Sequence, residues 1–248
     1  MSYEALASSY DALMCDGAYR KRAKYLQKLL KKSRIPVETV LDLACGTGTI
    51  SCLLAEAGYR VTATDGSEEM LTQAMVKAGE LKEPPFFLHQ SMPKLQLLEQ
   101  VDAAVSTLDS LNYLTKSKDL QETFKRVYKY LKPGGSFFFD VNSPYKLRRM
   151  DGQMYMDETE ESFCVWRTFF SEKQKTCTYQ VDLFQLREDG ETWDRDFEEH
   201  RERAWSDLEL RQFLTDAGFQ NIIITGDLTD KPPVEQEDRW NVRCVKPL

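Results

Sequence analysis

The stretch Val40-Leu-Asp-Leu-Ala-Cys-Gly-Thr-Gly-Thr49 decides the interpretation of the whole chain. Residues 40–43 are mostly apolar, which is typical of a buried strand, and Gly46 and Gly48 allow the tight bend that follows it. Beyond the bend, apolar residues recur at helical spacing from Ile50 onward. A strand, a glycine loop and a helix in this order predict a loop that binds a small ligand in an α/β protein.

Strands and helices alternate through the first 142 residues and return at the end of the chain. Helical spacing of apolar residues is found at 50–57, 67–78 and 117–131, and again from 206. Short apolar runs predict strands, with a tight turn at 132–135 before the fifth of them; the strands are 39–43, 59–64, 85–89, 101–106, 136–141, 219–225 and 239–245. This order predicts an α/β fold with a doubly wound, mostly parallel seven-stranded sheet.

A more polar region interrupts this alternation after Asn142. Its residues alternate as in antiparallel strands separated by short polar turns, at 162–171, 175–187 and 191–204. The prediction is a small antiparallel β-sheet inserted into the α/β domain. We therefore expect residues 1–145 and 205–248 to form one domain, and residues 146–204 to form an inserted lid or substrate subdomain.

The composition limits the classes of function that are open to the chain. Its 248 residues carry a formal net charge of −7, which disfavours a general binder of polyanions such as nucleic acid. No window approaches the roughly 20 apolar residues that cross a bilayer, and residues 1–14 lack the basic start and apolar centre of a secretory signal. We therefore expect a cytoplasmic protein that is not embedded in a membrane.

The cysteines and histidines do not predict a metal site. Only His89 and His200 could complete a cluster with cysteines, and no two cysteines form a C-x-x-C pair. Because a cytoplasmic protein with a large core keeps its thiols reduced, we expect free, buried side chains at Cys15, Cys45, Cys52, Cys164, Cys177 and Cys244.

One basic segment departs from the acidic composition. Residues 19–34 contain eight lysines and arginines and no acid. The pattern favours a solvated helix face whose opposite side, with Tyr25, Leu26, Leu29 and Leu30, is buried. A docking face for an anionic partner is the alternative.

The glycine loop differs from both common phosphate-binding loops. A dinucleotide loop needs glycine at the positions held here by Ala44, Gly46 and Thr49, and the β-branched Thr49 would crowd the helix packing that the last glycine permits. No Gly-Lys-Ser/Thr follows, so the loop is not a P-loop either. Asp42 would repel a pyrophosphate but suits a cationic amine or sulfonium. Asp65, at the end of the next strand, can accept hydrogen bonds from ribose hydroxyls, so the predicted ligand is a nucleoside without phosphate.

Four motifs, in this order and spacing, resemble the class I S-adenosylmethionine-dependent methyltransferases. They are Val-Leu-Asp-Leu-Ala-Cys-Gly-Thr-Gly (40–48), Thr-Asp-Gly-Ser-Glu-Glu-Met-Leu (64–71), Val-Asp-Ala-Ala-Val-Ser (101–106) and Leu-Lys-Pro-Gly-Gly (131–135). The resemblance spans residues 36–142 and departs from the family pattern at Ala44, where the family usually has glycine. It implies a Rossmann-like methyltransferase fold, S-adenosyl-L-methionine as the cofactor and S-adenosyl-L-homocysteine as its product.

The resemblance also implies which residues bind the cofactor. These residues, which include those of the glycine loop, are Tyr10, Asp42, Ala44, Cys45, Gly46, Gly48, Asp65, Gly66, Met70, Ser91, Met92, Leu108 and Asp109. The family pattern places 44–46 at the methionine part, Asp65 at the ribose, 66–70 and 91–92 around the adenine, and 108–109 beside the sulfonium. Tyr10, and less favourably Tyr19, would close over the methionine end; for both tyrosines and both methionines, ordinary packing is the alternative.

The inserted sheet favours a small-molecule methyl acceptor. Asn142-Ser-Pro-Tyr145 is similar to the Asn-Pro-Pro-Tyr signature of amino methyltransferases, but that signature follows the fourth strand and this segment follows the fifth. The sheet resembles the lid of glycine N-methyltransferase and of sugar N,N-dimethyltransferases. Its candidate pocket walls are Phe163, Trp166, Phe169, Tyr179 and Trp193, with Arg201, Arg203 and Asn142 as polar candidates. We expect transfer to an N or O atom of a small molecule, with nucleic acid disfavoured as a partner and the oligomeric state open.

No pattern predicts a covalent nucleophile, because a sulfonium is already an excellent leaving group and transfer depends mainly on in-line placement. Asp109, Tyr113 and His200 are the candidates for orienting or deprotonating an acceptor. A catalytically silent module that binds the cofactor or docks a partner is the alternative function, followed by an RNA-related methyltransferase. A nicotinamide oxidoreductase is disfavoured by Thr49.

Overall fold

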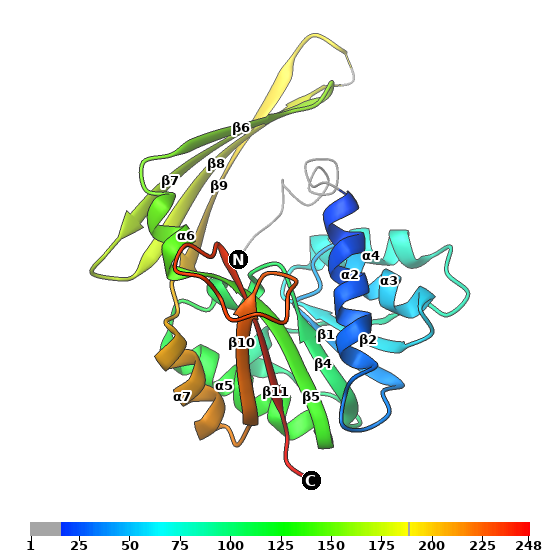
Figure 1. The fold of residues 1–248 in the computed structure, drawn as a ribbon. Helices are drawn as coiled ribbons and strands as arrows, with labels where there is room; N and C mark the ends of the chain where they lie inside the picture. The colour runs from blue at the N-terminus through cyan, green and yellow to red at the C-terminus, as the bar shows by residue number, and fades with distance from the viewer. Residues whose placement is uncertain (1–15, 188) are drawn as a thin grey trace.

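The computed structural model describes residues 16–187 and 189–248, which form two β-sheets (Figure 1). The larger sheet contains β1 (Thr39–Leu43), β2 (Arg60–Asp65), β3 (Phe86–His89), β4 (Val101–Ser106), β5 (Leu131–Asn142), β10 (Gln220–Gly226) and β11 (Arg239–Val245). Their order across the sheet is β10-β11-β5-β4-β1-β2-β3. Among these described strands β11 runs antiparallel to both of its neighbours, β10 and β5, and every other neighbouring pair is parallel. The predicted seven-stranded, mostly parallel sheet is therefore confirmed.

Helices cover both faces of the larger sheet. They are α2 (Asp16–Leu30), α3 (Thr49–Glu56), α4 (Glu68–Ala78), α5 (Ser117–Tyr130) and α7 (Asp207–Asp216), with short 3-10 helices η1 (Met92–Lys94) and η2 (Ser110–Tyr113). Figure 1 shows α2, α3 and α4 on one side and α5 and α7 on the other. Val40 and Leu41 of β1 belong to the two different cores, because successive side chains of a strand point to opposite faces. This two-sided covering is what the alternation of strands and helices predicts.

Side-chain caps start two of these helices. Ser67 Oγ accepts a hydrogen bond of 3.1 Å from Met70 N at the start of α4, and Ser206 forms a capping box with Glu209 at the start of α7. Both caps satisfy backbone amides that the first turn of a helix leaves without a partner.

The prediction of a separate turn at 132–135 is wrong, because these residues belong to β5. The pairing of β4 with β5 shifts register there, so the extra residues bulge from the strand while the chain stays in the sheet. A Cβ on Gly135 would lie 2.8 Å from the backbone oxygen of Asp102, and this close approach requires glycine.

The smaller sheet is antiparallel and lies beyond the carboxyl end of β5, which leads into α6 (Pro144–Arg149) (Figure 1). Its strands, in order, are β6 (Met154–Glu158), β7 (Ser162–Ser171), β8 (Thr176–Leu186) and β9 (Trp193–Arg203). The last three match the predicted strands closely. β6 and α6 were not predicted; all five residues of β6 are exposed, so no alternation of burial marks this strand.

The described cysteines, namely Cys45, Cys52, Cys164, Cys177 and Cys244, are free thiols. Cys15 lies outside the described residues. Within the described ranges no group of three metal-ligating side chains comes together. No helix in the same ranges is long and apolar enough to span a bilayer.

Candidate functional site

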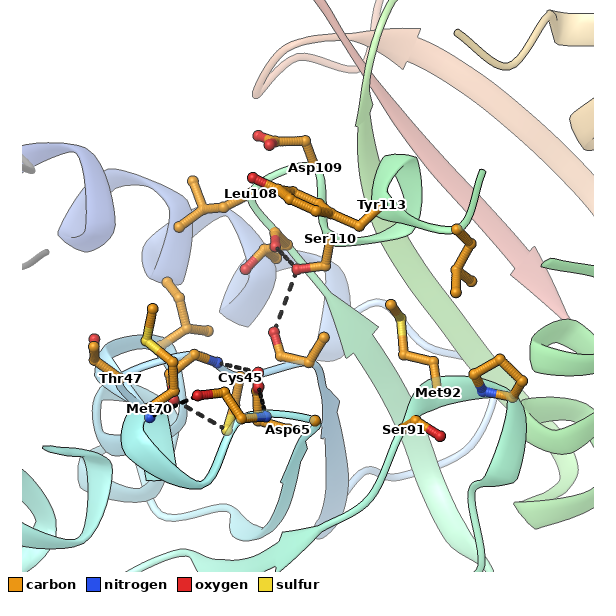
Figure 2. A pocket seen from close by; sticks show the side chains of 18 of the residues that line it. Cys45, Thr47, Asp65, Met70, Ser91, Met92, Leu108, Asp109, Ser110 and Tyr113 are labelled. Atoms are coloured by element: carbon orange, nitrogen blue, oxygen red, sulfur yellow. Dashed lines mark hydrogen bonds between the residues drawn. The ribbon is translucent and has the colours of Figure 1, made fainter. Parts of the chain in front are cut away.

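A cavity of about 220 Å³ opens at the carboxyl ends of β1, β2 and β4, beside the first turns of α3 and α4 (Figure 2). This is the edge at which open α/β sheets bind ligands. The predicted cofactor residues that line it are Ala44, Cys45, Gly46, Asp65, Gly66, Met70, Ser91, Met92, Leu108 and Asp109. Tyr19 also lines the cavity, whereas Asp42 and Gly48 do not, and Tyr10 lies outside the described residues.

The glycine loop passes through three left-handed residues, Ala44, Gly46 and Gly48, with φ of 59°, 56° and 73°. A Cβ added to Gly46 would meet no atom within 4 Å, so glycine here keeps the cavity side of the loop open. A Cβ added to Gly48 would lie 2.8 Å from the Cβ of Ala74 on α4. Gly48 therefore serves the packing of the loop against a helix, and its contribution to a ligand site is indirect.

Asp65 is held at the end of β2 by two backbone amides. The N–H of Gly46 donates to Oδ2 at 2.8 Å, and the N–H of Ser67 donates to Oδ1 at 2.9 Å. Burial raises the pKa of Asp65, and the two amides oppose that shift because they favour the ionised carboxylate. Each oxygen keeps acceptor capacity for a further donor, so this side chain can bind hydroxyl groups of a ligand in the cavity.

Asp42 lies beneath the loop, inside the core. Its side chain is buried and accepts a hydrogen bond of 2.5 Å from Ser51 Oγ on α3. Burial raises the pKa of Asp42 to about 7, while the bond from Ser51 acts in the opposite direction. Any effect of Asp42 on a ligand is therefore electrostatic and acts through the loop.

Met70 and Met92 are both core residues and cavity walls. Each is buried, and each lines the cavity with Gly66 and Ser91 close by in the chain (Figure 2). The two alternatives for these methionines, packing and ligand contact, are thus compatible. A flexible thioether suits a wall that contacts a flat ring.

The loop after β4 is held by charged residues from distant parts of the chain. Leu108 and Asp109 are left-handed, with φ of 58° and 56°, and their N–H groups donate to the Asp140 carboxylate at 3.0 and 2.9 Å. The Asp109 carboxylate forms a salt bridge of 2.5 Å with Arg239 Nη2, and Arg239 also pairs with Asp140. Arg22 Nη1 lies 2.9 Å from Asp140 Oδ2. The two loop residues are predicted site residues, whereas Asp140, Arg239 and Arg22 were not predicted to belong to the site.

Two sequence signals could have revealed part of this network. Arg22 follows Tyr19 by three residues and precedes Leu26 by four, which places it on the apolar stripe of α2. Asp140 is an acid inside the apolar run 137–141, where an unpaired carboxylate would be costly. Neither signal identifies the partner, because Arg22 and Asp140 are 118 residues apart.

The basic segment 19–34 is partly neutralised within the fold. Lys28 pairs with Asp230 at 3.2 Å, and Lys21 and Lys24 are exposed, as expected of a solvated helix face. The prediction is wrong for Arg22, which is buried in its ion pairs. Burial of this arginine is possible because acids face it.

Comparison with known proteins decides the family. A family model described as a methyltransferase domain matches residues 40–135. Over 249 residues the chain is 38% identical to the candidate methyltransferase YqeM of Bacillus subtilis (strain 168), an alignment that covers 99% of this chain and 98% of YqeM. The chain belongs to the class I S-adenosylmethionine-dependent methyltransferases.

Two solved structures share the fold of this methyltransferase. An S-adenosylmethionine-dependent methyltransferase from Clostridium acetobutylicum superposes with a TM-score of 0.87 at 29% identity, and the match covers 99% of both chains. The sugar N-methyltransferase KedS8 from a Streptoalloteichus species gives a TM-score of 0.78 at 19% identity and covers 100% of this chain and 94% of KedS8. Both alignments include the smaller sheet as well as the larger one.

The three predicted catalytic candidates of the methyltransferase lie near one another. Asp109 and Tyr113 line the cavity (Figure 2), and the His200 ring packs edge-on against Tyr113 with 6.2 Å between ring centroids. His200 Nε2 lies 2.9 Å from Glu198 Oε2 on the same strand. Because Arg239 pairs with the Asp109 carboxylate, Asp109 is better suited to orienting a bound ligand by its charge than to removing a proton from it.

The predicted pocket walls divide between the two faces of the smaller sheet. Trp166 and Tyr179 share a face with His200. The remaining three lie on the opposite face, away from Tyr113, and are Phe163, Phe169 and Trp193. Arg201 and Arg203 form ion pairs with glutamates that do not line the cavity, so their predicted role in a polar pocket gains no support.

Glu202 is a buried acid near the cavity that sequence analysis missed. It lies two residues from His200 on the same face of β9, and its Oε2 accepts a hydrogen bond of 2.7 Å from Asn142 Nδ2. Lys146 Nζ donates a hydrogen bond of 2.9 Å to the Oδ1 atom of the same Asn142 amide. Burial first, and the charge of Asp109 next, raise the pKa of Glu202 to about 8. An acid in a charged strand such as 193–203 carries no sequence signal of burial.

Proposed function

We propose that the protein transfers a methyl group from S-adenosyl-L-methionine to an N or O atom of a small molecule. The observation that carries this proposal is the charge of the cavity. Asp65 and Asp109 contribute carboxylates, and none of the described lining residues is a lysine, arginine or histidine. Such a lining is unfavourable for the phosphates of a nucleotide and favourable for a cationic sulfonium nucleoside.

The residues present fit this cofactor. Asp65 would accept hydrogen bonds from the ribose hydroxyls, the open space at Gly46 would admit the methionine part, and Met70 and Met92 would contact the adenine. Leu108 and Asp109 would border the sulfur. When bound, the cofactor supplies a methyl group on a positively charged sulfur.

The chain's own contribution to transfer is placement and proton handling. Tyr113 lines the cavity at the end of η2, four residues after Asp109, so its hydroxyl can orient an acceptor atom. An amine or alcohol that gains a methyl group loses a proton. His200 is a described group near Tyr113 that can take it up, whereas the raised pKa of Glu202 keeps that acid largely protonated near neutral pH.

A small acceptor is supported by the smaller sheet and by the charge of the protein. The face that carries His200, Tyr179 and Glu202 lies next to η2, so an acceptor bound at Tyr113 would be shielded from water by folded protein. KedS8, described as a sugar N-methyltransferase, aligns over this sheet as well. The net charge of −7 disfavours RNA as the acceptor.

Isothermal titration calorimetry tests the cofactor. We expect the purified protein to bind S-adenosyl-L-methionine and S-adenosyl-L-homocysteine, and to bind NAD and ATP far more weakly because their phosphates face acidic side chains. A protein that binds neither sulfur nucleoside would overturn the proposal.

Transfer of a labelled methyl group tests the acceptor. The protein and labelled cofactor are incubated with bacterial extract that has been separated into small-molecule, protein and RNA fractions. We expect label in the small-molecule fraction. Label in RNA alone would contradict the acceptor class, and cofactor binding without label in any fraction would favour a catalytically silent module.

A further inference from the structure

A chain of alternating charges runs from Asp227, which follows β10, through Arg22 of α2 to the cavity. Asp227 Oδ1 lies 3.1 Å from Arg22 Nη2, and Arg22 Nη1 lies 2.9 Å from Asp140 Oδ2. Arg239 then joins Asp140 to Asp109, with 2.5 Å between Arg239 Nη2 and Asp109 Oδ1. Asp140 is at the centre of this chain and is buried. Burial alone would raise its pKa, but Arg239 and Arg22 reverse the shift and the pKa of Asp140 is lowered.

Asp140 holds Leu108 and Asp109 in a backbone conformation that these two residues disfavour. Leu108 and Asp109 are consecutive non-glycine residues with positive φ, and left-handed backbone of this kind costs energy at each residue. The two Asp140 oxygens accept one amide each, from Asp109 at Oδ1 and from Leu108 at Oδ2. The strained pair therefore persists because a fixed carboxylate binds both of its N–H groups.

The same carboxylate connects three parts of the cavity wall. Leu108 and Asp109 line the cavity directly. Arg22 belongs to α2, whose Tyr19 lines the cavity from another side. Arg239 orients the Asp109 carboxylate while it binds Asp140. A change at Asp140 would thus move several walls at once, although Asp140 itself does not line the cavity.

We propose that Asp140 is a positioning residue for methyl transfer. It sets the left-handed loop Leu108–Asp109 so that these residues border the reactive end of the bound cofactor, and it carries Arg239 into contact with Asp109. This role rests on the proposed function, because the loop has a reactive end to border only if the cavity holds S-adenosyl-L-methionine. In this arrangement the network fixes the direction of the Asp109 side chain.

The chain contains a matched control at the opposite end of β4. Asp102 is also a buried strand carboxylate that accepts two consecutive amides, from Glu38 at 2.9 Å and Thr39 at 2.8 Å. It also forms a salt bridge of 2.7 Å with Lys132. Asp102 does not line the cavity, so Asp102→Asn reports the cost of damaging a buried carboxylate without touching the site.

The test compares Asp140→Asn with Asp102→Asn and the wild type at a temperature at which circular dichroism shows all three folded. We expect both variants to lower the melting temperature, because each replaces an acceptor oxygen with an amide that faces donors. Only Asp140→Asn should weaken binding of S-adenosyl-L-homocysteine. The expected loss of affinity is about tenfold, which corresponds to about 1.4 kcal/mol.

Amide NMR provides a readout that stability alone does not move. In the wild type, the N–H protons of Leu108 and Asp109 should resonate at low field and exchange slowly, because a carboxylate binds them. Asp140→Asn should shift both resonances and speed their exchange, whereas Asp102→Asn should leave them in place.

The outcomes separate this role from the proposed function. An Asp140→Asn protein with wild-type affinity for S-adenosyl-L-homocysteine would overturn the positioning role while the proposed function stands. Equal loss of affinity in Asp102→Asn would also overturn it, because the effect would then follow stability. A wild type that fails to bind would overturn the proposed function, and the positioning role with it.

Discussion

The two ends of the cavity are built in different ways. At the end near Asp65, neighbouring backbone amides of the glycine loop and of the turn after β2 hold the functional carboxylate. At the end near Asp109, charged side chains from α2, β5 and β11 hold the functional loop. The first end depends on local backbone geometry, and the second depends on ion pairs between distant segments. The difference suggests separate duties, in which one end binds the cofactor and the other positions it against an acceptor.

Asp65→Ala should give the largest effect and test this division. Loss of a carboxylate that accepts charge-assisted hydrogen bonds from ribose hydroxyls is expected to weaken S-adenosyl-L-homocysteine binding by about 100-fold, or about 3 kcal/mol, in calorimetry. Asp109→Ala serves as the comparison at the other end and should lower affinity by about tenfold or less. Equal losses from the two substitutions would show that both ends bind the cofactor alike.

Glu202→Gln tests whether a buried acid near the Asp109 end is held neutral. The folded-state pKa of about 8 lies above the value of 4.5 for a free glutamate, so the folded protein binds the proton more tightly and loses stability as pH rises from about 5 through 8. Glutamine cannot ionise. The variant should therefore lie within about 1 kcal/mol of the wild type near pH 5 and exceed its free energy of unfolding by roughly 5 kcal/mol at pH 9.

Urea unfolding at pH 5, 7 and 9 measures this difference for Glu202→Gln, for the wild type and for Glu199→Gln. Glu199 lies on the opposite face of β9 and pairs with Arg201, so it controls for loss of a carboxylate on the same strand. A pH-independent difference between Glu202→Gln and the wild type would contradict the raised pKa.

The contrast between the two ends also explains what could be predicted from sequence. The strands, the glycine loop and Asp65 lie within one stretch of chain, so spacing alone predicts their meeting at one edge of the sheet. Arg239 and Asp140 are 99 residues apart, and Asn142 and Glu202 are 60 residues apart. Such pairs depend on how the folded sheets meet, and a single sequence shows only that an arginine or an acid occupies an apolar stretch. Strand register likewise decides on which face of the smaller sheet each aromatic side chain lies.

Within the glycine loop, Gly46 and Gly48 should respond differently to alanine. Gly48→Ala places a Cβ 2.8 Å from Ala74 at a φ of 73° and should lower the free energy of unfolding by about 2 kcal/mol. Gly46→Ala meets no atom within 4 Å and should cost only about 1 kcal/mol of stability from its left-handed backbone. Its Cβ would instead enter the space proposed for the methionine part of the cofactor. Urea unfolding and calorimetry together separate the two, and a larger loss of affinity in Gly48→Ala than in Gly46→Ala would contradict the assignment.

Tyr113→Phe should give the smallest effect and act at the Asp109 end alone. The change keeps the ring that packs against His200 and removes only the hydroxyl. If that hydroxyl orients the acceptor, the rate of methyl transfer to the small-molecule fraction should fall by about three- to tenfold, which is the worth of one hydrogen bond, while cofactor affinity stays unchanged. Tyr25→Phe is the matched control, because its hydroxyl donates to the Thr229 carbonyl at 2.9 Å and it does not line this cavity. A fall in cofactor affinity with an unchanged transfer rate would place Tyr113 with the cofactor and break the division between the two ends.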